Sequence, residues 1–290
     1  MSQQNQVHSQ PPAAAPTAFD GVNPCLVEDT ALLPKVVDAV VDAGASILER
    51  FSPLANRPDG LEAVIAAIHA NDEVSVRHLR APLRCARPTA GWVDDELATG
   101  PLPAGEWWVP DVLEGNINHI HGMRDWSVTA TLVRDNKPVL TAVHVPLTGE
   151  TFTAVQGGGA MLDGQRLHPS AKSELKGAFV ATGQARPGED AATFERIGAS
   201  LTAMLNSVLL ARVSVPATTQ LAHVAAGQID AFWQYSDVRS GLLGGALLVA
   251  EAGGMVTDTR GRPWSLASED ILAATPALHH DLLNVLATVR

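Results

Sequence analysis

The sequence has few cysteines and no long hydrophobic run, and each absence excludes a class of protein. Only two cysteines occur in 290 residues, Cys25 and Cys85, and their spacing matches no metal-binding motif. We interpret them as free thiols. The apolar stretches are short and broken by glycine, proline or charge, so none approaches the length of a membrane span. The sequence therefore predicts a globular protein without a membrane partner.

Basic residues are also scarce, with 20 Lys and Arg against 31 Asp and Glu and a formal net charge of −11. This charge argues against a nucleic-acid partner. The first 22 residues are rich in Gln, Pro and Ala and lack the apolar segment of a signal peptide. We predict that residues 1–22 form a disordered leader and that the protein is cytoplasmic.

The chemistry is concentrated in residues 107–122, where a strand-like run meets two acids. Trp107 to Pro110 leads into Asp111, Glu114 follows three positions later, and a Gly-Asn turn comes next. This pattern predicts a strand that presents two carboxylates at its carboxyl end. Such carboxylates suit a hard cation such as Mg²⁺. A turn with solvated acids is the alternative interpretation.

Hydrophobic periodicity predicts two amphipathic helices before this stretch, over residues 34–51 and 61–83. A short strand at Trp92 and Val93 then ends in a second acidic cluster, residues 94–96. Residues 126–167 alternate between strands and turns, which predicts an antiparallel meander. The glycines at 157–159 are predicted to form a tight turn and not a phosphate cradle, because no helix follows them.

From about residue 177 the pattern changes to strands that alternate with helices, which predicts a sheet covered on both faces. The expected strands are 179–182, 209–213, 229–233, 255–257 and 271–274, and the expected helices are 190–205, 217–226, 242–251 and one from 276 onward. We therefore divide the chain into the leader, an α+β half over 23–172 that carries the acidic motif, and an α/β half over 173–290.

Three motifs resemble those of the inositol monophosphatase-like phosphatases, the family that includes fructose-1,6-bisphosphatases. Trp108 to Gly122 is similar to W-x-x-D-P-x-D-G-T-x-N-[FY]-x-H-G, and residues 158–164 (GGAMLDG) and 251–254 (EAGG) match two further motifs. The resemblance implies an α/β fold, a layered α/β/α/β/α sandwich that is commonly a homodimer. It also implies Mg²⁺ ions that activate a water and hold the phosphate of a small phosphomonoester.

The resemblance assigns ligands, but the sequence departs from the family pattern at several of them. Asp95 and Glu96 fall on the two glutamates of a G-E-E strand end, so that a shorter acid occupies the first place. Asp111 matches a bridging aspartate, while Glu114 replaces the second aspartate of its motif. The resemblance therefore implies Asp95, Glu96, Asp111 and Glu114 as metal ligands.

Other departures concern the water and the substrate. Asp72 matches the acid of T-x-x-D, and Asn116 stands where a threonine orients the attacking water. Counting back from the EAGG motif places Gly241 where W-D-x-A-A-G has a metal-ligating aspartate. Asp237 could replace that acid only if its loop is rebuilt, and Gln234 takes the place of a substrate-contacting glutamate. The magnesium site is expected to be weakened.

Histidines make a different chemistry conceivable. His119 stands where the motif has Phe or Tyr, and His144 lies on the strand that carries Y-D-P in the family. An imidazole pair beside Asp111 and Glu114 could perform acid/base chemistry or bind Zn²⁺. The alternative is that both histidines are hydrogen-bonded core or subunit-contact residues.

Three functions follow as hypotheses. The first is a Mg²⁺-dependent phosphatase that acts on a small phosphorylated metabolite through a weakened metal site. The second is an enzyme of the same fold rebuilt for elimination, hydrolysis or cyclisation, with Asp72, Glu114, Asn116, His119 and His144 as candidate catalytic residues. The third is a non-catalytic binding homologue. Specificity is expected from loops near 55–61 and 186–191.

Overall fold

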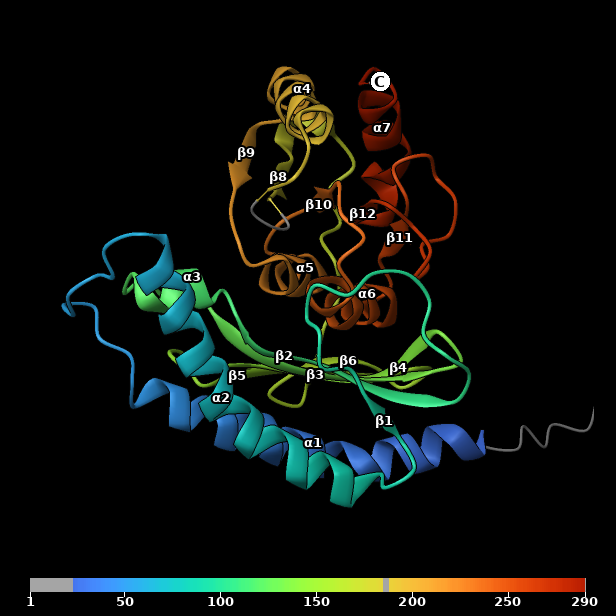
Figure 1. The fold of residues 1–290 in the computed structure, drawn as a ribbon. Helices are drawn as coiled ribbons and strands as arrows, with labels where there is room; N and C mark the ends of the chain where they lie inside the picture. The colour runs from blue at the N-terminus through green and yellow to red at the C-terminus, as the bar shows by residue number, and fades with distance from the viewer. Residues whose placement is uncertain (1–22, 185–187, 290) are drawn as a thin grey trace, which may run out of the picture.

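The computed structural model describes residues 23–184 and 188–289, and the predicted leader and two positions of the 186–191 loop lie outside them. Five layers stack in the order helices, sheet, helices, sheet, helices (Figure 1). The outer helices α1 (Pro24–Leu48) and α2 (Leu61–Ala86) cover one face of the first sheet. This arrangement confirms the predicted α/β/α/β/α sandwich.

The first sheet has seven strands in chain order, and its first pair is parallel while the others are antiparallel. At the tip of β3 and β4, Asp135 and Asn136 both have positive φ angles (47° and 65°), which suits a two-residue hairpin turn. The strands are β1 (Gly91–Trp92), β2 (Glu106–Glu114), β3 (Ser127–Arg134), β4 (Lys137–Val145), β5 (Glu150–Val155), β6 (Gly159–Leu162) and β7 (Gln165–Arg166).

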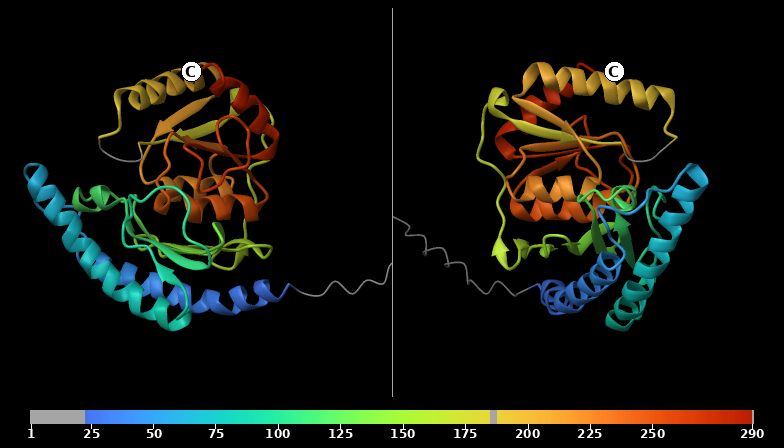
Figure 2. Two further views of the ribbon diagram at one scale, coloured as in Figure 1. Left: turned by 45° about the vertical axis from the view of Figure 1, so that its right-hand side comes forward. Right: turned by 90° about the vertical axis from the view of Figure 1, so that its left-hand side faces the viewer.

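The second sheet has five strands in the order β11-β12-β10-β8-β9, with β10 parallel to β8 and antiparallel to β12. Helices α5 and α6 lie between the two sheets, and α4 and α7 cover the far face (Figures 1 and 2). The strands are β8 (Phe179–Thr182), β9 (Leu210–Val213), β10 (Ala231–Gln234), β11 (Met255–Thr257) and β12 (Ile271–Ala274). The helices are α4 (Ala191–Ser207), α5 (Ala217–Ala225), α6 (Ser240–Ala252) and α7 (Pro276–Leu286). The predicted sheet covered on both faces is confirmed.

Helix α1 begins ten residues earlier than the periodicity predicted. Asn23 caps it by accepting the N–H of Cys25, and Pro24 occupies the first turn, where the missing N–H costs nothing. The helix then continues through Pro34, because Leu32, Val36 and other residues of one face are buried against the sheet. The predicted start at residue 34 was therefore wrong.

The two sheets share a hydrophobic core through the helices between them. Phe152 of the first sheet and Phe232 of the second belong to one buried cluster with Leu221 of α5 and Leu248 of α6. The division of the chain near residue 172 stays a prediction, since the packing joins both sides. No helix in the described ranges is long and apolar enough to span a membrane.

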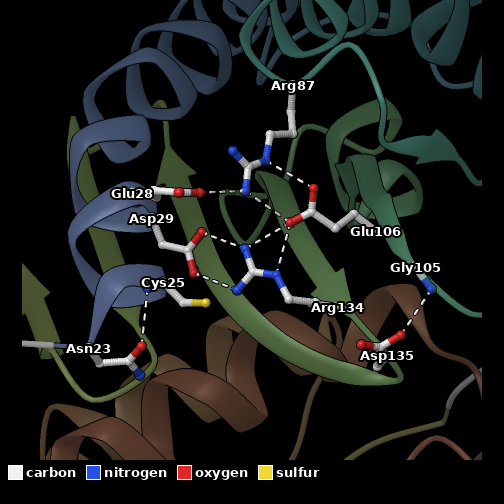
Figure 3. Close-up of polar contacts among 9 residues, drawn as sticks. All are labelled: Asn23, Cys25, Glu28, Asp29, Arg87, Gly105, Glu106, Arg134 and Asp135. Atoms are coloured by element: carbon white, nitrogen blue, oxygen red, sulfur yellow. Dashed lines mark hydrogen bonds and ion pairs between the residues drawn. The ribbon is translucent and has the colours of Figure 1, made fainter.

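A partly buried ion-pair network fastens α1 and α2 to the first sheet (Figure 3). Arg134 donates two hydrogen bonds to the buried carboxylate of Asp29, at 2.8 and 2.9 Å, and a third to Glu106. Arg87 binds the same Glu106 and also Glu28. Burial raises the pKa of Glu106, but the hydrogen bonds from Arg87 and Arg134 outweigh it and hold that pKa below its ordinary value.

The glycine turn at residues 157–159 is already occupied by a side chain of the protein. The N–H groups of Gly157 and Gly159 each donate to a carboxylate oxygen of Glu251, at 2.9 Å. Glu251 opens the EAGG motif, so two of the motifs that define the resemblance contact each other. The donors that a phosphate would need are taken, in agreement with the predicted tight turn.

Candidate active site

A β-bulge at the end of β2 brings the two acids of the motif to the same face of the sheet. Residues three apart on a regular strand point to opposite faces. Here Asp111 pairs with Thr129 and Glu114 pairs with Ser127, so three steps on β2 match two on β3. Because the two β3 partners face the same side, Asp111 and Glu114 do too. Both are buried, each with 7% of its surface exposed.

The bulge is held on both sides by polar side chains. The N–H of Val112 donates to Oε1 of Glu96 at 3.3 Å, and the Val112 carbonyl accepts from the hydroxyl of Ser75 on α2. Glu96 therefore lies against the bulge, where its charge acts on Asp111. Asp95, in contrast, is exposed and accepts the N–H of Leu97 in a local turn. Of the two predicted ligands, Glu96 is therefore the one that lies beside Asp111.

Glu114 reaches the start of α5. Its Oε1 accepts the N–H of Thr218 at 3.0 Å, and its Oε2 is buried without a hydrogen-bond partner among the described residues. Gly115, which follows, has a φ of 81°, and a Cβ there would lie 2.7 Å from the carbonyl of Asp125. Asn118 donates to that carbonyl and to the carbonyl of Val215, which positions the start of α5 beside Glu114.

A second line of polar groups runs from α2 to the same site. Nδ2 of Asn116 donates to Asp72 at 2.8 Å and to the carbonyl of Ile68 at 3.1 Å, and its Oδ1 accepts from Asn71. Asn116 thus fixes Asp72 although it lacks the hydroxyl expected at its position. The sequence placed Asp72 and Asn116 in one site, and the structure brings them together.

The four acids of the site hold their protons more tightly than isolated acids. Burial, followed by the charges of Glu96, Glu114 and Asp72, raises the pKa of Asp111 well above its ordinary value. Burial also raises the pKa of Glu96 and of Glu114 to about 7 and that of Asp72 to about 6. Hydrogen bonds from Thr218 to Glu114 and from Asn116 to Asp72 oppose this rise. Carboxylates this close need protons or a cation between them.

His119 is fully engaged inside the protein. Its Nδ1 accepts from Nδ2 of Asn71, and its Nε2 donates to the carbonyl of Ile47, both at 3.2 Å. The ring packs edge-on against Phe51 and Trp126. Burial lowers the pKa of His119, so the neutral tautomer with a proton on Nε2 satisfies both partners. This geometry matches a hydrogen-bonded core histidine.

His144 lies on the opposite face of the sheet from Asp111. It pairs with Val128, the neighbour of Thr129, so its side chain points toward α1. There it approaches Gly44 so closely that a Cβ on that glycine would be 2.6 Å from the ring, and its Nδ1 contacts the Thr151 hydroxyl. The expected pair of His119 and His144 beside Asp111 is therefore wrong. Neighbouring strands do not imply a shared face.

Two further predicted residues, Gln234 and Asp237, form no hydrogen bond with the four acids in the described chain. Gln234 ends β10 and is buried, with its Oε1 unpartnered among the described residues. Asp237 lies in the loop before α6 and is not among the acids whose charges raise the pKa of Asp111. Reasoning from sequence missed Ser240, whose hydroxyl donates to the carbonyl of Glu96 at 2.9 Å and which opposes the rise in the pKa of Asp111. It also missed Thr218, for which the only signal was a helix start after Pro216.

A cavity of about 370 Å³ opens beside the site between α2, α3 (Asn116–Ile120) and the loop that follows α1. Arg50, Ser52, Asn71 and His119 are among its lining residues. Nε of Arg50 donates to Oδ1 of Asn71 at 2.9 Å. Asn71 thus connects the cavity to Asn116 and the acids.

Comparison with known proteins agrees with this architecture. A model of the inositol monophosphatase family matches residues 32–289. The chain is 30% identical over 258 residues to inositol-1-monophosphatase of Rhizobium meliloti (strain 1021), which covers 89% of this chain and 96% of the relative. The chain belongs to the inositol monophosphatase family. Family membership supports a phosphatase function.

Solved structures extend the agreement to the fold. Inositol monophosphatase from Anabaena (Nostoc) sp. PCC 7120 superposes with a TM-score of 0.76 at 24% identity, over 90% of this chain and 97% of that one. The extragenic suppressor protein suhB from Bartonella henselae gives a TM-score of 0.75 at 26% identity, over 88% and 98%. This member of the inositol monophosphatase family therefore shares the fold of these solved structures.

The buried acids of this family member are oxygen donors, the type of ligand that a hard cation prefers. Asp111, Glu96 and the unpartnered Oε2 of Glu114 offer oxygen ligands of the kind that Mg²⁺ takes together with waters. Position 241 has no side chain to add. Within 23–184 and 188–289, no three His, Cys, Asp or Glu side chains converge into a ready-made metal site.

Proposed function

We propose that the protein is a Mg²⁺-dependent phosphomonoesterase for a small phosphorylated metabolite, with a weakened metal site. One observation carries the proposal: the β2 bulge gathers Asp111 and Glu114 on one face beside Glu96, and Oε2 of Glu114 has no hydrogen-bond partner in the described chain. Asp111, Glu96 and Glu114 would hold the cation. Bound there, Mg²⁺ would polarise the phosphate and lower the pKa of a water.

Asp72 is the residue best placed to take a proton from the attacking water. A general base works best when its pKa lies near the working pH, and burial raises the pKa of Asp72 to about 6. Asn116 holds its carboxylate in place through the 2.8 Å hydrogen bond. Asn116 therefore positions Asp72. The threonine that the family motif has at this place would instead orient the attacking water directly.

The cavity beside Asn71 is the proposed place for the part of the substrate that does not react. Four of its seven lining residues are polar, and the exposed Arg50 among them offers a positive charge that is oriented by Asn71. Such a wall favours a polar or anionic group over an apolar one. The proposed substrate class is a phosphomonoester with further hydroxyl or acidic groups.

Phosphate release tests the proposal. Purified protein is incubated with a panel of sugar, inositol and nucleotide phosphomonoesters with Mg²⁺ or with EDTA, and released phosphate is measured. We expect release that requires Mg²⁺ at millimolar concentrations and is lost in Asp111→Asn, while the matched control Asp94→Asn, at an exposed acid paired with Arg80, keeps it. Absence of Mg²⁺-dependent release across the panel would sink the proposal.

A second candidate is acid/base chemistry without phosphate transfer. It is supported by Glu96 and Glu114, whose pKa values of about 7 suit proton transfer near neutrality. The histidines no longer support it, because His119 is engaged in the core and His144 points away. A non-catalytic role is a third candidate, since a relative from Pseudomonas aeruginosa that is 31% identical over 218 residues is named Nus factor SuhB.

We also propose a homodimer and a cytoplasmic location. Leu209, Leu210 and Val213 are exposed on or next to the edge strand β9, and exposed apolar groups at an unpaired strand edge favour a partner chain. Light scattering during size exclusion should give twice the 30.5 kDa of one chain. A mass of 30.5 kDa at micromolar concentration would refute the dimer.

A further inference from the structure

The carboxylate of Glu114 occupies the space above Gly241, the second residue of α6. A Cβ built on Gly241 would lie 3.1 Å from Oε1 of Glu114, the one atom outside the local helix backbone that comes within 4 Å of it among the described residues. This separation is tighter than ordinary van der Waals contact, so with a side chain at position 241 the Glu114 carboxylate would have to shift by a few tenths of an ångström. A side chain at position 241 and the carboxylate of Glu114 therefore compete for the same space.

The backbone around Gly241 is fixed by the same residue that anchors Glu114. The hydroxyl of Thr218 donates to the carbonyl of Gly241 at 2.9 Å, while the Thr218 N–H donates to Glu114 at 3.0 Å. Neither the start of α5 nor the start of α6 can therefore move away without breaking one of these bonds. These two bonds hold the backbone of Gly241 and the carboxylate of Glu114 in fixed positions relative to each other.

The length of Glu114 is what allows it to reach this place. An aspartate at position 114 would end about 1.5 Å sooner, the length of one C–C bond, and would lose the hydrogen bond to Thr218. The longer residue keeps that bond through Oε1. Its Oε2 is buried and has no hydrogen-bond partner in the part of the chain that the structure describes, so it remains available to a ligand.

We propose that Glu114 supplies, from β2, the carboxylate that a side chain at position 241 would otherwise supply from α6, so that residues 114 and 241 form a complementary pair. The long acid and the missing side chain compensate each other. The affinity of the site for a divalent cation then depends on the length of side chain 114 when residue 241 is glycine. It no longer does so when residue 241 carries its own carboxylate. The inference rests on the proposed cation site but not on phosphatase activity.

A double-mutant cycle with two readouts tests the pair. The variants are Glu114→Asp, Gly241→Asp and the double variant, and the readouts are Mn²⁺ affinity by electron paramagnetic resonance and urea unfolding in EDTA. Each single change is expected to weaken Mn²⁺ about tenfold or more, the first by withdrawing the ligand and the second by crowding it. The double variant is expected to recover the wild-type affinity and most of the lost stability.

Gly198→Asp is the matched control, because it adds an acid to an exposed helical glycine with no atom within 4 Å of the new Cβ. It should leave Mn²⁺ affinity unchanged. Additive effects of the two substitutions on affinity and stability would overturn the inference. If neither the wild type nor the double variant binds Mn²⁺, both this inference and the magnesium site of the proposed function are overturned. If Mn²⁺ binds but no phosphate is released from any substrate, only the proposed function is overturned.

Discussion

Neutralising Glu114 should stabilise the metal-free protein at alkaline pH and not at acidic pH. The change Glu114→Gln keeps the acceptor for the Thr218 N–H and removes a buried negative charge that lies in the field of Glu96 and Asp111. In the wild type without a cation, that charge must form inside the protein as the pH rises. The variant avoids it.

The direction follows from proton binding. Folding raises the pKa of Glu114 from its ordinary 4.5 to about 7, mainly through burial. Between these values the folded state binds more protons than the unfolded state, so the free energy of unfolding falls as the pH rises. At about 1.4 kcal/mol per pH unit, the contribution lost between pH 5 and pH 8 is roughly 2 to 3 kcal/mol. Any cost of burying the Gln amide is the same at both pH values and cancels in the comparison.

Urea unfolding in EDTA at pH 5 and pH 8 gives the required free energies. We expect the variant to gain roughly 2 to 3 kcal/mol on the wild type between the two pH values. Asp94→Asn, which removes an exposed acid, serves as the control and should show no such gain. An equal effect of Glu114→Gln at both pH values, or a relative loss at pH 8, would refute the reasoning.

Three further predictions concern other parts of the molecule. Arg134→Met should lower the free energy of unfolding by about 3 kcal/mol in urea titrations, because it leaves the buried Asp29 carboxylate without its main partner, and a loss well under 1 kcal/mol would contradict this. His144→Ala should lower the free energy of unfolding by about 1 to 2 kcal/mol, while kcat/KM per folded molecule stays unchanged. A large loss of kcat/KM would instead show that His144 takes part in catalysis. Arg50→Ala should raise KM for anionic substrates about tenfold with little change in kcat, whereas the control Arg77→Ala, at an exposed residue of α2, should not.

Local patterns predicted most of the elements, because the fold repeats simple periodicities. The meander from Ser127 to Arg166 and the alternating elements after Phe179 followed from alternation and turn residues. The start of α1 was missed because Pro34 is tolerated inside a helix whose buried face continues on both sides of it. Tertiary packing outweighed the local signal there.

The site was predictable as a set of residues but not as a geometry. Asp111, Glu114, Asp72 and Asn116 were found from motifs, yet the bulge that turns Glu114 to the face of Asp111 depends on pairing with β3. The same pairing sends His144 to the opposite face. Thr218 and Gly241 meet Glu114 only because α5 and α6 start side by side, more than 100 residues after β2.

The central claim is that the β2 bulge and Glu96 form a site for a divalent cation. A crystal of the protein grown with Mn²⁺ and phosphate tests it most directly, through an anomalous difference map. We predict a peak bound to the carboxylates of Asp111 and Glu96, with Glu114 facing it. A map with no peak at these residues at millimolar Mn²⁺, or with a peak only at the exposed Asp94 and Asp95, would contradict the account.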